Sequence, residues 1–129
     1  MKIQTRHDNN VAIIMVSGRF YPNLIHQFFQ EISEQLAAGY NCLIIDLKQM
    51  DFLNSVGIKA IVQAAEQARK QGGDLHIANA RKNVFYTLKL AGIDKIIKVH
   101  PGTIGTMSSY IPERYSINEA GYLINICSR

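Results

Sequence analysis

The stretch that decides the fold is Cys42-Leu-Ile-Ile-Asp-Leu47, followed by Met50-Asp-Phe-Leu-Asn-Ser-Val-Gly57. The first part is a short apolar run, which is typical of a strand buried on both faces of a parallel sheet. Beyond the second part, apolar side chains recur every three or four residues with polar ones opposite. We therefore expect a helix from about Ser55 to Gln71, which Gly72-Gly73 stops.

Strand and helix patterns alternate on both sides of this unit. We expect further strands at Ile3–Arg6, Val11–Val16, Leu75–Ala78 and Lys95–Val99, and helices between Pro22 and Gly39 and from Asn83 to Leu90. Strands that alternate with helices predict a mostly parallel sheet. The fold class is therefore α/β, with a central sheet of about five strands covered by helices.

The last part of the chain is less regular. Prolines and glycines interrupt residues 101–115, so we expect an irregular loop there. Ser116 and Glu119 form an S-x-x-E capping box ahead of several apolar residues, which predicts a terminal helix over 116–127. At 129 residues, the chain fits a single domain, 1–129.

The charged residues and the lengths of the apolar runs indicate what kind of surface and location to expect. Lys and Arg outnumber Asp and Glu by 14 to 10, and the basic residues look scattered along the chain. We interpret them as a solvated surface, with a patch for an acidic partner or nucleic acid as the alternative. The N-terminus is polar, and the longest apolar runs are far below the ~20 residues that span a bilayer. We expect a cytoplasmic protein without a membrane span.

Metal and cofactor motifs are missing from the sequence. The four histidines are dispersed, and Gly72-Gly73 precedes a strand instead of opening a helix as a phosphate-binding turn does. Cys42 and Cys127 lie in apolar surroundings outside any C-x-x-C pair, so we expect two buried thiols. We predict no metal and no cofactor.

The loop before the second helix holds the candidate site. Asn54 or Ser55 can act as the N-cap of that helix, and capping is the simplest role for either residue. Asp51 lies at the carboxyl edge of the sheet, where ligands of parallel α/β folds bind, although a role in the turn is equally consistent. Phe52 and Leu53 are core residues by default, and any that reach the surface would form part of a partner patch.

The sequence resembles the STAS family, the domain shared by anti-sigma factor antagonists and the cytoplasmic tails of sulfate transporters. The resemblance spans roughly residues 2–100 and is strongest over 43–99. It is carried by Leu43-Ile-Ile-Asp-Leu, Asn54-Ser55-Val56-Gly57, Gly72-Gly73-Asp74-Leu75, Leu90-Ala91-Gly92-Ile93 and Lys95-Ile96-Ile97.

The resemblance implies a non-catalytic, partner-switching module. Ser55 inherits the position of the phosphorylated serine, with a partner-binding loop and helix at Asp51, Phe52, Leu53, Asn54, Val56, Gly57 and Lys59. The implied partners are a serine kinase that is itself an anti-sigma factor, of the histidine-kinase-like ATPase type, and a cognate serine phosphatase. Direct nucleic-acid binding is not expected.

Three residues depart from the family pattern. Asn54 replaces an Asp, Val56 replaces a second hydroxyl residue, and Tyr21 lies near a position where many antagonists carry an Asp. Two alternatives remain open. One is a scaffold or small-ligand-binding domain of the same fold in which Ser55 is only a helix cap, and the other is an enzyme that uses Asp46, Asp51 and Ser55.

Overall fold

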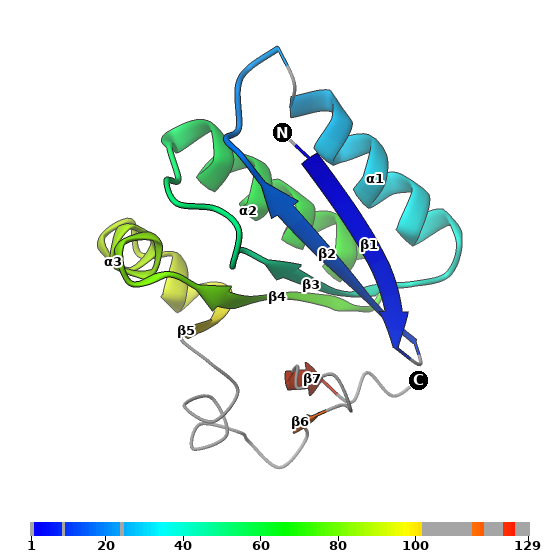
Figure 1. The fold of residues 1–129 in the computed structure, drawn as a ribbon. Coiled ribbons are helices and arrows are strands. Elements are labelled where there is room, and N and C mark those ends of the chain that lie inside the picture. The colour runs from blue at the N-terminus through cyan, green and yellow to red at the C-terminus, as the bar shows by residue number, and fades with distance from the viewer. Residues whose placement is uncertain (1, 9, 24, 102–114, 118–122, 126–129) are drawn as a thin grey trace.

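The protein is described by a computed structural model that covers residues 2–8, 10–23, 25–101, 115–117 and 123–125. The order of elements is β1 (Lys2–Asp8), β2 (Val11–Ser17), α1 (Ile25–Ala37), β3 (Cys42–Asp46), α2 (Ser55–Lys70), β4 (Asp74–Ala80), α3 (Lys82–Leu90), a 3₁₀ turn η1 (Ile93–Lys95), β5 (Lys98–Pro101), β6 (Tyr115–Ile117) and β7 (Leu123–Asn125). The first nine elements form one α/β unit (Figure 1).

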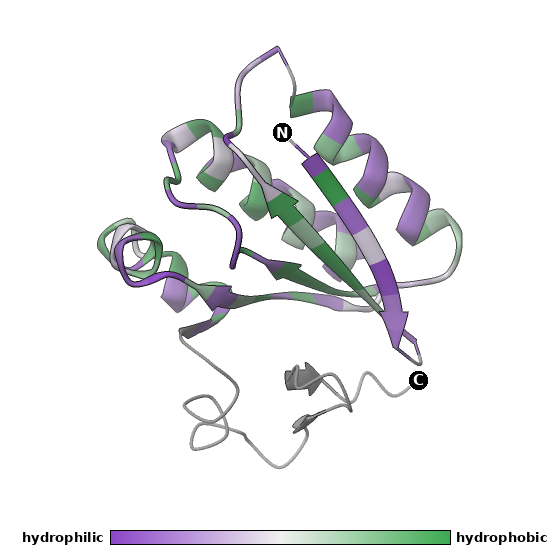
Figure 2. Cartoon of the chain, in the orientation of Figure 1, coloured by the Kyte–Doolittle hydropathy of each residue, from purple (hydrophilic) through white to green (hydrophobic). Residues whose placement is uncertain are grey.

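Five strands make the main sheet, and their order in the sheet is their order in the chain, β1-β2-β3-β4-β5. β1 pairs antiparallel with β2, and every later pair is parallel. The predicted mostly parallel sheet of five strands is therefore confirmed. In Figure 2, β2 and β3 are almost wholly hydrophobic, whereas the edge strand β1 is mostly hydrophilic.

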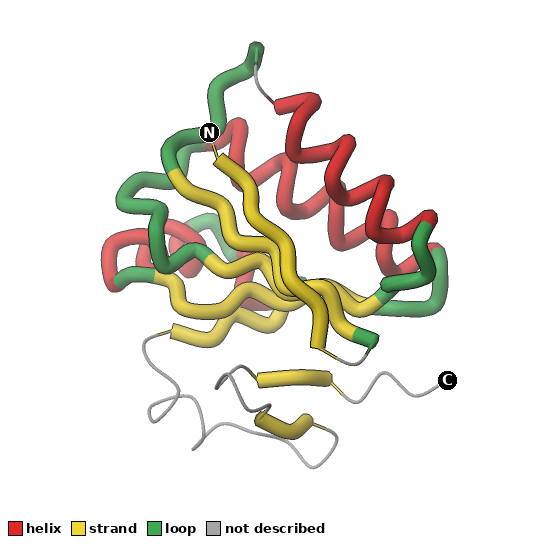
Figure 3. The backbone as a smooth tube through the Cα atoms, turned by 45° about the vertical axis from the view of Figure 1, so that its right-hand side comes forward, coloured by secondary structure: helices red, strands yellow, loops and turns green. Residues whose placement is uncertain are grey.

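All three helices pack on one face of the sheet (Figure 3). They share a single core with alternate residues of the strands, such as Ile14, Ile45 and Ile77. α1 contributes large side chains, Phe28 and Ile32 among them, whereas α2 contributes mainly alanines. Because alanine is small, α2 can lie close to the strands that it covers.

Two glycine positions explain how α2 ends. Gly72 has a φ of 83°, a conformation that glycine adopts without strain, so the chain turns sharply after the helix. A side chain at Gly73 would collide with the backbone of Asn41, at the start of β3. The predicted helix stop at Gly72-Gly73 is thus confirmed, and it brings β4 into register beside β3.

The last strand of the main sheet begins later than expected. The prediction placed it at Lys95–Val99, but residues 93–95 form η1, and β5 is Lys98–Pro101. Gly92 takes a left-handed conformation, and the Ile97 N–H then donates to the Ile93 carbonyl over 2.8 Å. These local bonds hold the apolar residues before Lys98 in a turn and keep them out of the sheet.

The expected terminal helix over 116–127 is wrong where the structure describes that range. Tyr115–Ile117 and Leu123–Asn125 are strands, and they pair antiparallel with each other. Tyrosine and isoleucine favour strands, and Gly121 weakens a helix between them. The remaining residues of that range, and most of the expected loop at 101–115, lie outside the described residues.

Buried polar groups lie on the sheet beside the apolar core. His76 Nδ1 and His100 Nε2 are 3.4 Å apart, and His76 Nε2 lies 3.6 Å from a carboxylate oxygen of Asp74. Burial lowers the pKa of His100 to about 4, and the charges of His76 and Lys98 act in the same direction. Burial would raise the pKa of Asp74, but hydrogen bonds from His76, the Leu75 N–H and Arg69 together hold it well below its usual range.

The expectation of buried thiols is wrong for Cys42. This residue is buried at the start of β3, as expected, but it is bonded in a disulfide. Apolar surroundings suit a thiol and a disulfide equally, so the local pattern could not separate them. Cys127 lies outside the described residues.

Candidate functional site

The candidate site lies at the carboxyl edge of the sheet, where β2, β3 and β4 all end on the same side (Figure 1). Three connections meet there: residues 18–23 after β2, residues 47–54 after β3, and the short passage from β4 to α3. The Arg81 Nε donates to the Lys48 carbonyl over 2.9 Å, and the Asn83 side chain donates to the Asp51 carbonyl over 2.7 Å. The loop that carries the candidate residues is thus anchored from α3.

Asn54 is the N-cap of α2. Its backbone is extended (φ −100°, ψ 179°), and its side-chain oxygen accepts the Gly57 N–H over 2.9 Å. Its side-chain nitrogen donates to the Phe20 carbonyl, also over 2.9 Å. One amide group therefore caps the helix and fastens the β2–α1 connection to it.

Ser55 is the first residue of α2, and its side chain is exposed. The capping role belongs to Asn54, and within the described residues the Ser55 hydroxyl makes no hydrogen bond. The interpretation of Ser55 as a helix cap is therefore wrong. No acidic residue lies in the first turn of α2, so the positive end of the helix dipole faces this hydroxyl without a competing carboxylate.

Gly57 explains the close contact between the β2–α1 connection and α2. A methyl group at this position would lie 2.5 Å from Phe20 Cδ2 and 2.7 Å from Leu53 Cδ1. Phe20 is buried and packs edge-on against Phe28, with ring centroids 5.2 Å apart. Only a residue without a side chain leaves room for this packing below the first turn of α2.

Exposed aromatic and cationic side chains lie on the two connections that meet at the start of α2. The Phe52 ring is 47% exposed, and the Arg19 guanidinium lies 4.9 Å from its centroid. Tyr21, on the connection that Asn54 holds, is 48% exposed. Exposed aromatic residues beside a cation are common in surfaces that bind proteins.

The residues expected to bind a partner differ in their exposure to solvent. Asp51, Phe52 and Lys59 are exposed, whereas Leu53 and Gly57 are buried. Asn54 and Val56 are half-buried. Leu53 is therefore a core residue that supports the loop, and Phe52 is the apolar side chain that reaches the surface.

Asp46 and Asp51, the two carboxylates of the possible enzyme site, have separate structural roles. Asp46 is fully buried, and its carboxylate accepts the Lys48 N–H over 2.9 Å. Asp51 is exposed, and its carbonyl binds Asn83. Over the described ranges, no three His, Cys, Asp or Glu side chains gather as a metal site would require. None of the helices there is long and apolar enough to cross a membrane.

Three residues of this site were not predicted from the sequence: Arg19, Phe20 and Asn83. Arg19 and Phe20 follow Gly18 after a strand, and Asn83 is in the first turn of α3. The only sequence feature that these residues share is that they follow strands whose carboxyl ends meet at one edge of the sheet. That feature does not identify the residues that each of them contacts.

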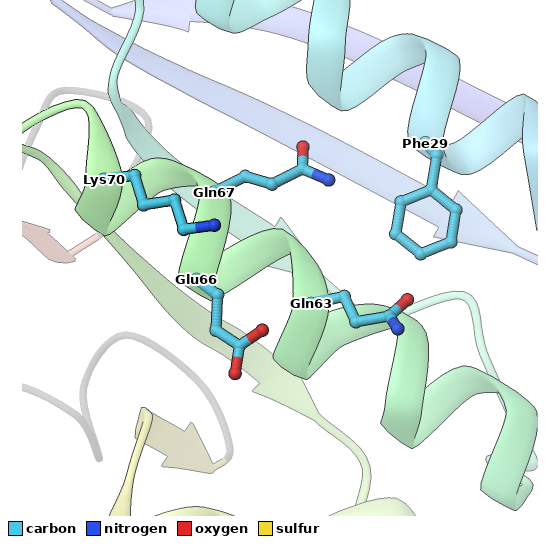
Figure 4. Close-up of a pocket in the computed structure, with 5 residues that line it drawn as sticks. All are labelled: Phe29, Gln63, Glu66, Gln67 and Lys70. Atoms are coloured by element: carbon cyan, nitrogen blue, oxygen red, sulfur yellow. The ribbon is translucent and has the colours of Figure 1, made fainter.

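A shallow groove of about 350 Å³ lies elsewhere, along the seam between α1 and α2. Figure 4 shows Phe29 of α1 facing a row of polar side chains on α2, namely Gln63, Glu66, Gln67 and Lys70. The seam contains none of the residues around Ser55. It is a separate feature of the helical face.

Comparison with known proteins assigns the chain to a family. The family model described as the STAS domain matches residues 2–103, which include every strand of the main sheet and all three helices. The chain belongs to the STAS domain family. The predicted membership is confirmed, and the matched range ends just beyond β5.

Three similar proteins illustrate what this STAS chain resembles. The Anti-sigma F factor antagonist of Paenibacillus polymyxa is 19% identical over 110 residues, which cover 84% of this chain and 93% of the relative. An anti-sigma factor antagonist from Mycobacterium paratuberculosis has a crystal structure that matches with a TM-score of 0.70 and 25% identity, covering 84% of this chain and 92% of the other. The phosphorylated form of the Bacillus cell fate determinant SpoIIAA matches with a TM-score of 0.64 and 13% identity, over 86% and 100% of the two chains. This chain has the STAS fold of the anti-sigma factor antagonists.

Proposed function

We propose that this STAS chain is a non-catalytic anti-sigma factor antagonist, whose binding to its partner is controlled by reversible phosphorylation of Ser55. The partner is a serine kinase that is also the anti-sigma factor, of the histidine-kinase-like ATPase type, and a serine phosphatase resets the switch. The exchange takes place in the cytoplasm, where ATP is available to the kinase. The names of the relatives support the class of function.

One observation carries the proposal for this chain: the Ser55 hydroxyl is exposed at the start of α2 and makes no hydrogen bond to any residue that the structure describes, because Asn54 performs the capping. A hydroxyl that caps a helix would have to give up a hydrogen bond before it reacted. The Ser55 oxygen is available without that loss, and the anchored loop holds it in a defined place.

The chemical step is an ordinary phosphoryl transfer. The Ser55 oxygen attacks the γ-phosphorus of ATP bound to the kinase, the new O–P bond forms, and the bond from the γ-phosphorus to the bridging oxygen of ADP breaks. The hydroxyl proton passes to a base of the kinase. The phosphatase transfers the phosphoryl group to water, which regenerates the serine and releases inorganic phosphate.

The fold of α2 can accommodate the phosphate. It adds about −1.5 to −2 charges at a helix N-terminus, where the N–H groups of Ser55 and Val56 have no carbonyl one turn back to bind. Lys59 lies one turn further along the same face of α2, and its side chain is exposed. Phosphorylation should therefore leave the folded state intact.

A bound partner, in contrast, would cover the phosphate. Ser55 begins α2, Asn54 fastens the connection that bears Arg19 and Tyr21 to that end of the helix, and the exposed Phe52 lies three residues before Ser55. A protein that packs over these exposed side chains would remove water from the phosphate. Desolvating a charged group without a new cation costs several kcal/mol, and about 4 kcal/mol already weakens binding about a thousandfold. Phosphorylation acts as a release signal.

The test compares the chain isolated from its native cells with Ser55 variants. Peptide-level mass spectrometry should find a phosphate on Ser55, and the Ser55→Ala chain should lack it. The Ser33→Ala chain is the matched control, since Ser33 is an exposed helical serine on α1. The kinase partner, once purified, should bind the Ser55→Ala chain at least as tightly as the unmodified chain and bind Ser55→Asp far more weakly.

Two results would overturn the proposal. One is a Ser55 that stays unmodified under several growth conditions and in the presence of the purified kinase. The other is full partner affinity in the phosphorylated chain.

The groove between α1 and α2 favours a second candidate function, small-ligand binding by a STAS scaffold. Its volume is sufficient for a small molecule, and Phe29 gives it an apolar wall opposite the amide groups of Gln63 and Gln67. A ligand bound there would raise the melting temperature of the wild type and leave that of Phe29→Ala unchanged. Ser55→Ala would respond like the wild type, which separates this function from the first.

A further inference from the structure

Large apolar side chains are exposed on α3 and at Ile96, the residue that follows η1. Tyr86 is 61% exposed, Leu90 is 70% exposed and Ile96 is 50% exposed. Tyr86 and Leu90 are four residues apart, so they project from the same side of α3, whereas Val84 and Leu88 fill the core on the other side. These residues protrude into solvent without any contribution to the core cluster.

Lysines lie between and beside these apolar side chains. Lys82 and Lys89 are exposed on the same side of α3 as Tyr86, and Lys95 is exposed in η1 next to Ile96. We call these six residues the α3 face: Lys82, Tyr86, Lys89, Leu90, Lys95 and Ile96. α3 lies at one edge of the molecule, away from α1 (Figure 1).

The net charge of the chain is concentrated in the segment of sequence that carries this face. Residues 81–99 contain five Lys and Arg and a single acidic residue, Asp94. The whole chain has 14 basic and 10 acidic residues, so the other parts hold nine of each and are neutral on balance. The sequence interpretation of a scattered basic surface is therefore incomplete, because the entire formal charge of +4 belongs to one segment.

We propose that the α3 face is a peripheral membrane-binding site for anionic lipids. An extended negative surface attracts a molecule whose excess positive charge lies on one side, and the lysines then pair with lipid phosphates. The apolar side chains insert between the headgroups, where tyrosine, leucine and isoleucine are stabilised and neighbouring lysines can extend to the phosphates.

The form of the face favours a lipid surface over an acidic protein. Three apolar side chains that each protrude by half or more need three matching pockets in a folded partner, whereas a fluid interface accommodates them wherever they fall. This inference is independent of Ser55, which is neither on α3 nor on η1.

The test measures binding of the full chain to lipid vesicles by co-sedimentation. Vesicles of equal parts phosphatidylcholine and phosphatidylglycerol should bind the chain, and vesicles of phosphatidylcholine alone should bind it far more weakly. Each lysine near such a surface contributes about fivefold to the partition coefficient, so Lys82→Gln/Lys89→Gln/Lys95→Gln should weaken binding roughly a hundredfold. About 1 M salt should abolish most of the attraction, because the screening length falls to about 3 Å.

Two further variants give the test its controls. Tyr86→Gln/Leu90→Gln removes exposed apolar groups without touching the core, and it should weaken binding severalfold while the melting temperature stays the same. Lys2→Gln/Lys59→Gln/Lys70→Gln removes the same charge from exposed positions on β1 and α2, and it should bind like the wild type.

The proposal is overturned if the wild type does not sediment with anionic vesicles. It is also overturned if both triple variants lose affinity equally, since that would mean a nonspecific effect of net charge. A chain that ignores vesicles but shifts a DNA duplex or binds an acidic peptide through the same lysines would assign the face to another class of partner.

Discussion

At the scale of single residues, Asn54 is the most informative position of the site. It accepts a hydrogen bond from Gly57 through its oxygen and donates one to the Phe20 carbonyl through its nitrogen. The aspartate that the family pattern leads one to expect can perform only the first of these tasks, because an ionised carboxylate has no donor. The departure from the family pattern therefore couples the connection that bears Arg19 and Tyr21 to the start of α2.

Replacing Asn54 by aspartate should separate the two tasks. Asn54→Asp keeps the acceptor for the Gly57 N–H but places an oxygen against the Phe20 carbonyl. We expect the unfolding free energy to fall by about 1–2 kcal/mol, as for a lost hydrogen bond with one buried partner left unpaired. Amide hydrogen exchange should become faster at residues 19–23 while the Gly57 amide keeps its protection.

Asn54→Ala provides the comparison, because it removes both hydrogen bonds. The Gly57 amide and residues 19–23 should then both exchange faster. Equal exchange rates at residues 19–23 in the wild type and Asn54→Asp would show that the bond to Phe20 does not hold this connection.

At the scale of elements, the contact between α2 and the β2–α1 connection depends on Gly57. Gly57→Ala forces a methyl group against Phe20 and Leu53, and overpacking of this kind costs about 1–3 kcal/mol. Alanine gains up to about 1 kcal/mol in helix propensity, so we expect a net loss of about 1–2 kcal/mol. Urea denaturation of the two chains measures the difference.

A second substitution tests whether Phe20 causes that loss. In a Phe20→Leu background the smaller side chain leaves room for the methyl group, so adding Gly57→Ala should cost less than it does in the wild type. Strictly additive effects of the two substitutions would exclude a steric clash between these positions.

The elements themselves were predictable wherever one pattern was long and unambiguous. β3 and α2 follow from an apolar run and a helical spacing, and Gly72 ends the helix as expected. The range 116–127 combines a capping box with strand-favouring residues, so local signals there conflicted, and the helix prediction was wrong over β6 and β7.

The site was predictable only in part for a related reason. That Ser55 follows β3 in a loop can be read from the chain, but whether it or Asn54 caps the helix depends on backbone angles. The contact with Phe20 and the bond from Asn83 join segments about 30 positions apart, and no local pattern records such pairs.

At the scale of the whole molecule, the stability of the fold should depend on pH. The pKa of His100 is about 4 in the folded chain and about 6.5 in the unfolded chain, so the unfolded state binds a proton more readily. Stability should therefore fall as the pH decreases from about 6.5 to about 4, by up to about 3 kcal/mol. Asp74, whose pKa is also lowered, adds its own loss only below about 4.

Chemical denaturation at pH 7 and at pH 4.5 measures the change in unfolding free energy over the range in which His100 titrates and Asp74 does not. His100→Gln should lose most of the difference between the two conditions, whereas His26→Gln, which replaces an exposed histidine of α1, should keep it. A wild-type chain that is equally stable at both values would contradict the assignment to His100.

The strand order β1-β2-β3-β4-β5 also bears on how the chain is made. Since every strand pairs only with its predecessor and successor, a chain leaving the ribosome can extend its sheet one strand at a time, without waiting for a distant segment. Besides the edge at β1, each completed step leaves one newly formed open edge, and the next strand to emerge covers that edge before another molecule does. The ribosome therefore releases the strands in the same order in which they pair in the sheet. This should limit misassembly while the protein is still being translated.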